Sequence, residues 1–188
     1  AHGVELIRRA KEQGMTITAD VSAHQLFLNE MDINSFNSMC HVLPPLRSQR
    51  DMEALRQAVR EGVIDAICSD HQPHEPDAKQ APFASTQPGI SSLETLLPLS
   101  LRLVHEQLIP TYTAQSLLST QPADILGMST GVIAVNKPAD LCIYDPELEW
   151  QLDSTNMHSR GKNTPFEGWN FQGKVRYTII DGTPVHTA

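Results

Sequence analysis

The 188-residue chain is poor in cysteine and has no long apolar run. Its three cysteines, Cys40, Cys68 and Cys142, are far apart and form no Cys-Xaa-Xaa-Cys pair. The sequence therefore predicts neither a disulfide framework nor a zinc ribbon, and reduced thiols in a cytoplasmic protein are expected. No stretch approaches the roughly 18 apolar residues of a membrane helix, and no basic-then-apolar leader is present, so neither a membrane span nor a signal peptide is predicted.

Positive charge is also scarce. Lysine and arginine number 14 against 22 aspartates and glutamates, which gives a formal net charge of −8 without the basic stripe of a nucleic-acid-binding protein. No nucleic-acid partner is therefore predicted. The length suits one domain or one and a half. The first residue is Ala1 and helical periodicity begins at once, so we expect a fragment that starts inside a domain.

Two helix-to-strand units follow each other along the chain. The apolar spacing predicts a helix over residues 3–13 and a strand over 15–21, then a helix over 49–61 and a buried strand over 63–68. Ser48 is suited to cap the second helix, and Gly62 to end it. Such units with site-like loops after each strand are typical of the last part of a (β/α)8 barrel.

The turn after the second predicted strand carries the most chemistry. Asp70, His71 and His74 follow residues 63–68 directly, and Pro73 stops any regular element. Polar groups at the C-terminal end of a barrel strand lie where catalysis takes place, which makes Asp70 the first candidate. A capped turn, in which Asp70 accepts backbone N–H bonds, explains the same pattern, and both interpretations stay open.

Two further polar residues have an open interpretation. His24 follows the first predicted strand and is either a site residue or an ordinary loop histidine. Arg47 follows a double proline, and its guanidinium is suited either to bidentate binding of an anionic substrate or to a structural ion pair.

The pattern changes in the last third of the chain. A buried helix is predicted over 93–106 and two short helices over 113–118 and 122–126. After Gly131 apolar residues alternate, and Asp181-Gly182 is a strong hairpin signal. This predicts a small β module over residues 131–188, placed against a barrel part over residues 1–130.

Four blocks together resemble the dihydroorotases, which are cyclic-amide hydrolases of the amidohydrolase superfamily. They are Leu-Pro-Pro-Leu-Arg at 43–47, Ser-Asp-His-Gln-Pro-His at 69–74, Gly-Ile-Ser-Ser-Leu-Glu-Thr-Leu-Leu-Pro-Leu at 89–99 and Gly-Lys-Asn-Thr-Pro-Phe-Glu-Gly at 161–168. Their order and spacing cover almost the whole chain. The last block makes the chain more similar to the bacterial class that associates with aspartate carbamoyltransferase than to allantoinases or hydantoinases.

The resemblance implies an α/β fold, the C-terminal portion of an amidohydrolase (β/α)8 barrel with a small β-sandwich module. It implies zinc at the strand ends and interconversion of dihydroorotate and carbamoyl aspartate, a step of pyrimidine biosynthesis. Asp70 matches the aspartate that touches zinc and shuttles the proton. His74, Pro88 and Gly89 match substrate-binding positions, and Arg47 is the fourth candidate for substrate binding.

The sequence also departs from the family pattern. The His-Xaa-His pair and the other metal ligands of the family lie outside these residues, so zinc is expected in an intact parent and not on this chain alone. Leu43 replaces an asparagine, Gln72 replaces an alanine, and residues 22–26 differ from the usual Thr-Pro-His-His-Leu. Such changes are similar to those of dihydroorotase-like paralogues that have lost activity.

Two main hypotheses for function therefore stay open. The parent is either a zinc dihydroorotase or an inactive dihydroorotase-like scaffold for aspartate carbamoyltransferase. A weaker third hypothesis is another cyclic-amide hydrolase of the superfamily. In both cases we expect no turnover by the 188 residues alone. A few barrel strands cannot close into a barrel, so a homo-oligomer or a second chain that covers the open edge is expected.

Overall fold

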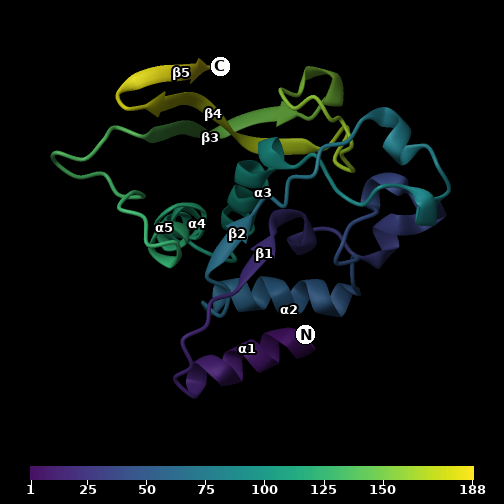
Figure 1. Ribbon diagram of the computed structural model, residues 1–188, viewed down its shortest axis with the longest axis horizontal. Helices are drawn as coiled ribbons and strands as arrows, with labels where there is room; N and C mark the ends of the chain where they lie inside the picture. Colours follow the sequence, from purple (N-terminus) through teal and green to yellow (C-terminus); the bar gives the residue numbers. More distant parts are fainter.

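The computed structural model describes residues 1–188, and two helix–strand units lie at its centre. They are α1 (His2–Glu12) with β1 (Asp20–Ser22), and α2 (Gln49–Arg60) with β2 (Ala66–Cys68). The strands pair in parallel, with Val21 opposite Ile67. In Figure 1, α2 and then α1 lie on one side of this pair and α3 on the other. Both helices begin and end within a residue of the predicted bounds, whereas each strand pairs over only three residues.

Three more helices follow the second strand. They are α3 (Leu93–His105), α4 (Thr111–Leu118) and α5 (Thr120–Ile125), and none of the helices is long and apolar enough to cross a membrane. The connections contain short 3₁₀ turns: η1 (Ala23–Leu26), η2 (Glu30–Phe36), η3 (Ser38–Cys40), η4 (Pro76–Lys79), η5 (Phe83–Ser85) and η6 (Ser154–Asn156).

The C-terminal residues form an antiparallel sheet of β3 (Leu141–Gln151), β4 (Asn170–Ile180) and β5 (Thr183–Thr187), in that order. Asp181 and Gly182 join β4 to β5 with φ of 47° and 75°, the left-handed values of a type I′ hairpin turn. The predicted hairpin is therefore present, but the predicted β-sandwich is not. A sandwich needs two stacked sheets, whereas residues 131–188 form a single sheet, which packs against α3.

One apolar core runs through the molecule. Ile67 of β2 and Leu99 and Leu103 of α3 belong to the same buried cluster as Phe166 and Phe171 from the C-terminal part. Gly173 of β4 lies so close to Leu101 of α3 that a Cβ atom there would come within 2.3 Å of the leucine side chain. The C-terminal part thus packs directly on α3, the helix that follows the Asp70 turn. The predicted boundary between two domains at residue 130 stays a prediction.

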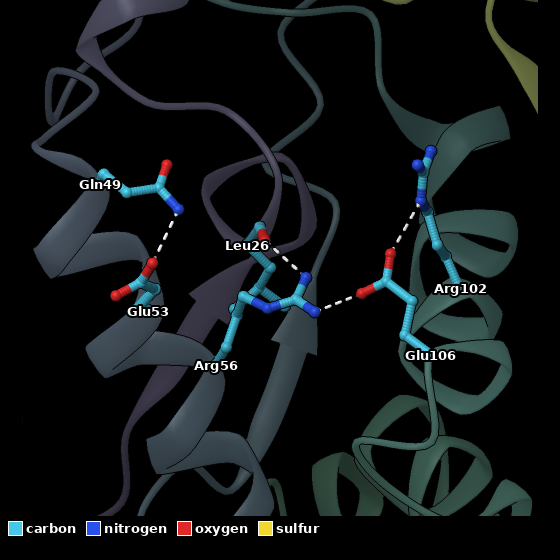
Figure 2. A network of polar contacts seen from close by, with 6 residues as sticks. All are labelled: Leu26, Gln49, Glu53, Arg56, Arg102 and Glu106. Carbon is cyan, nitrogen blue, oxygen red and sulfur yellow. Dashed lines mark hydrogen bonds and ion pairs between the residues drawn. The ribbon is translucent and has the colours of Figure 1, made fainter.

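A network of polar contacts joins α2 to α3 (Figure 2). Arg56 donates to the Leu26 carbonyl oxygen at 3.2 Å and forms an ion pair with Glu106, which also accepts from Arg102 Nε at 3.1 Å. Both guanidinium groups lie over the Phe27 ring, 5.2 and 5.7 Å from its centre. Burial alone would raise the pKa of Glu106, but the hydrogen bonds and charge of the two arginines outweigh burial and lower it.

This network predicts a measurable pH dependence. Glu106→Ala should lower the free energy of unfolding at neutral pH by about 1 kcal/mol, a small value because the carboxylate is partly exposed and screened. Since the pKa of Glu106 is lowered on folding, its contribution is present above pH 4.5 and is lost as the pH falls through the folded-state value. Urea denaturation at several pH values measures the difference.

The matched control lies in the same view (Figure 2). Glu53 accepts only a hydrogen bond from Gln49, at 2.9 Å on the exposed face of α2. Glu53→Ala should therefore cost less than about 0.5 kcal/mol. Equal losses for the two variants would show that the Glu106 network adds nothing to the packing of α2 and α3.

Candidate active site

Asp70 lies just beyond the end of β2 in a strained backbone conformation. Its φ of 49° is in the left-handed region, which costs a residue with a side chain about 1 kcal/mol and is tolerated best by aspartate and asparagine. Gln72 Nε2 donates to Asp70 Oδ1 at 2.7 Å, and the Ser22 hydroxyl, at the end of β1, lies 3.4 Å from Oδ2. No backbone N–H group donates to this carboxylate, so the capped-turn interpretation does not describe it.

His24 is buried beside this carboxylate. Its side chain is 1% exposed, and neither ring nitrogen has a hydrogen-bond partner. Burial lowers the pKa of His24 to about 4, against the opposite effect of the Asp70 charge, so the imidazole is neutral at pH 7. His24 thus lies in the connection after β1 and is buried there, while its membership of a site stays a prediction. A buried histidine with free nitrogens is an expensive arrangement, and it is typical of a ligand position.

His24 and Asp70 are donors of the kinds that zinc prefers. They do not make a zinc site by themselves, because no three His, Cys, Asp or Glu side chains in the chain gather closely enough to hold a metal ion. Cys68 is the nearest thiol in sequence, but burial raises its pKa to about 11, which disfavours the thiolate that binds metals. The donor set fits zinc in kind and falls short in number.

The two histidines of the turn have different tasks. His71 Nδ1 accepts hydrogen bonds from the backbone N–H groups of Ser92 and Leu93, at 3.0 and 3.2 Å, and so caps the start of α3. Burial lowers the pKa of His71 despite the opposite effect of Glu94, which favours the neutral acceptor. His74 Nε2 instead contacts the Pro88 carbonyl oxygen at 3.0 Å. The structure thus joins two of the predicted substrate-binding residues.

The loop of Pro88 and Gly89 runs beside the Asp70 turn. Gly89 has a φ of 133°, and a Cβ atom there would come within 2.5 Å of Gln72 Cβ. Its N–H group donates to the His41 carbonyl oxygen at 2.8 Å, while Gln72 N–H donates to Ile90 O at 2.8 Å. Glycine is therefore required here by the neighbouring turn itself, whatever ligand the loop contacts.

A buried asparagine from the C-terminal part holds both loops. Asn163 Nδ2 donates to the carbonyl oxygens of Gln72 and Gly89 at 2.9 and 3.0 Å, and Asn163 Oδ1 accepts from His74 N–H at 2.7 Å. At Gly161 a Cβ atom would lie 2.6 Å from His74 N, so this segment packs tightly on the turn. Sequence reasoning missed the task of Asn163, although its block of residues 161–168 was the available signal.

Arg47 lies on the surface, two residues before α2. Its guanidinium makes no hydrogen bond or ion pair, while its carbonyl oxygen accepts from Glu30 N–H at 2.8 Å. The structure therefore bonds His74 to Pro88 directly and links the Asp70 turn to Gly89 through Asn163, and it does not tie Arg47 to them. Substrate binding by Arg47 stays a prediction.

Comparison with known proteins supports the α/β fold. The structure superimposes on the L-hydantoinase (dihydropyrimidinase) of Arthrobacter aurescens with a TM-score of 0.92 and 27% identity, over 99% of this chain and 43% of that one. The model of the amidohydrolase family matches residues 1–185, and the chain belongs to this family.

Relatives in sequence confirm the predicted resemblance to dihydroorotases. The chain is 46% identical to a dihydroorotase-like protein of Pseudomonas aeruginosa, over 99% of this chain and 44% of that protein. It is 38% identical to a dihydroorotase of Geobacter sp. strain M21, over 97% of this chain and 43% of that enzyme. The chain thus spans less than half the length of these relatives and matches a C-terminal part of them.

The three hydrogen bonds of the Asn163 side chain form a clamp between the two loops. Shortening this side chain should therefore cause a large loss of stability. Asn163→Ala should lower the free energy of unfolding by about 3 kcal/mol, because it leaves the buried Gly89 carbonyl and the partly buried Gln72 carbonyl and His74 N–H without partners. Asn163→Asp should cost about as much despite its equal size, because its oxygen would face the Gln72 and Gly89 carbonyls. Urea denaturation measures both, and losses below about 1 kcal/mol would contradict the clamp.

Proposed function

We propose that the protein containing these residues is a dihydroorotase-type amidohydrolase that opens and closes the cyclic amide of dihydroorotate. The observation that carries the proposal is the fixed contact between the Asp70 turn and the Pro88–Gly89 loop beyond a parallel strand. It holds the turn that carries the Asp70 carboxylate in a fixed relation to the loop of Pro88 and Gly89. The relatives named dihydroorotase support the same substrate class.

In this proposal each residue has a simple task. Asp70 holds the proton taken from the attacking water and returns it to the ring nitrogen that leaves, which is general acid–base catalysis by one carboxyl group. The loop of Pro88 and Gly89 packs against the ring, and His74 fixes this loop through its contact with the Pro88 carbonyl oxygen. Zinc is expected in the protein as it works, with His24 and Asp70 among its ligands, and would polarise the amide carbonyl when bound.

The two helix–strand units are inferred to belong to a (β/α)8 barrel whose other strands lie outside the 188 residues. This inference is supported by the strong structural likeness to hydantoinases over less than half of their length. The further metal ligands would then come from those strands.

A scaffold function is the second candidate. It is favoured by the 46% identity to a protein named dihydroorotase-like and by the Gln72 amide, which already occupies Asp70 Oδ1. In this case the natural gene product that carries residues 1–188 would bind aspartate carbamoyltransferase and show no hydrolysis.

Asp70→Asn tests the enzymatic proposal in that gene product. Asparagine tolerates the left-handed backbone of residue 70, so stability should be retained, while hydrolysis of dihydroorotate should fall by about 10²–10⁴-fold. Asp77→Asn is the matched control, because Asp77 is exposed and makes no side-chain contact in the neighbouring turn η4. A wild-type rate in Asp70→Asn would refute the role of Asp70.

Size-exclusion chromatography with aspartate carbamoyltransferase from the same source tests the scaffold. If the scaffold is correct, the two proteins elute together and no dihydroorotate is hydrolysed by either the mixture or the wild-type protein alone. Hydrolysis by the wild-type protein that is lost in Asp70→Asn excludes a purely structural function.

A further inference from the structure

A cavity of about 580 Å³ lies between the first turns of α3 and the C-terminal sheet. Figure 1 shows α3 packed beneath β3 and β4, the two strands that supply most of the opposite wall. None of Asp70, His74, Pro88 and Gly89 lines this cavity. Its volume is typical of small-molecule sites, which measure about 300–1,000 Å³. The cavity is thus a concave surface that shares no residue with the candidate active site.

Much of the cavity wall is apolar. Leu97 and Pro98 come from α3, Trp150 comes from β3 and Val175 from β4. Leu93, in the first turn of α3, also lines the cavity, and its side chain is 58% exposed and so is accessible to a ligand. Aliphatic side chains and an indole together give an aromatic ring a large apolar contact surface. The wall therefore suits a ligand with a flat, apolar body.

Three basic side chains line the same cavity. The Lys174 ammonium group lies 5.5 Å from the centre of the Trp150 ring, and the rings of His158 and His186 pack edge to face with their centres 5.3 Å apart. None of these three side chains forms a hydrogen bond or an ion pair within the chain. Their N–H groups are therefore free to donate to a ligand, and an anionic oxygen is the strongest acceptor for them.

The two acidic side chains of the cavity are already bound within the fold. Glu94 Oε1 accepts from Ser159 N–H at 3.2 Å. Both carboxylate oxygens of Asp153 accept hydrogen bonds, Oδ1 from Thr155 N–H at 2.9 Å and Oδ2 from Asn156 Nδ2 at 2.6 Å. Because the acidic groups are bonded while the basic groups are free, the cavity is complementary to an anion and not to a cation.

We propose that this cavity binds a small aromatic carboxylate. The ring would lie against Trp150 and the apolar residues of α3, and the carboxylate would accept from Lys174 and from the two histidines. The single lysine charge matches the single charge of a carboxylate. The site lies outside the candidate active site, so the proposal does not depend on whether the protein hydrolyses dihydroorotate.

The probe is 4-benzoylbenzoate, an aromatic carboxylate that crosslinks under ultraviolet light, used on the natural gene product that carries residues 1–188. We expect a Kd of the order of 0.1 mM by calorimetry, as the binding efficiency of drug-sized ligands gives for its size. The neutral 4-benzoylbenzamide should bind about fivefold more weakly, and the cationic 4-benzoylbenzylamine more weakly still. After irradiation with the carboxylate, peptide mass spectrometry should find the label within residues 93–98, 150–158 or 173–175.

A lysine variant tests the charge complementarity. Lys174→Met keeps the length of the side chain and removes its charge, so the Kd of the carboxylate should rise about fivefold, the order expected for an ion pair that water partly screens. The Kd of the amide should stay unchanged, and Lys174→Arg should bind the carboxylate as the wild-type protein does. Lys137→Met is the matched control, because Lys137 is also exposed and does not line the cavity.

Four results would overturn the proposal: no binding of 4-benzoylbenzoate, a label found only outside the cavity, equal or tighter binding of the amine, or a loss in Lys174→Met no larger than in Lys137→Met. Because none of these measurements uses hydrolysis, they leave the proposed function untouched.

Discussion

The geometry of the candidate site depends on the side-chain amide of Asn163. This group comes from a segment 91 residues away from Gln72 in the sequence and binds the backbone of both loops at once. Because all of its bonds end on backbone atoms, the clamp sets the position of the loops whatever side chains they carry. The positions of the two loops are therefore set by backbone contacts.

Much of the fold could be predicted because its signals are local. Helix α2 follows from its apolar spacing, the Ser48 cap and the Gly62 stop, and the β4–β5 hairpin follows from Asp181-Gly182, which supplies two left-handed residues. Local signals do not give the lengths of the strands, nor do they show whether a second sheet completes a β-sandwich. A strand is defined by its partner, and partner choice depends on residues far away in the sequence.

In the candidate site, too, only the features with local signals could be predicted. Asp70 could be chosen as a candidate because a carboxylate directly after a buried strand is a local pattern, and its role in a site stays a prediction. The burial of His24 and the amide of Gln72 on Asp70 could not be predicted, since they depend on how separate turns pack. The task of His71 could not be predicted either, because it caps α3 by accepting a hydrogen bond from Ser92 N–H, which lies 21 residues later in the sequence.

The chain thus holds the Asp70 carboxylate, the neutral His24 imidazole and the loop of Pro88 and Gly89. One histidine and one aspartate are too few donors to hold a metal ion. We infer that these residues form one side of a binding site for a cyclic amide. A crystal structure of the natural gene product soaked with dihydroorotate tests it most directly. We predict that the ring lies between the Asp70 carboxylate and the backbone of Gly89; a ring bound elsewhere, or no bound ring at saturating concentration, would contradict the account.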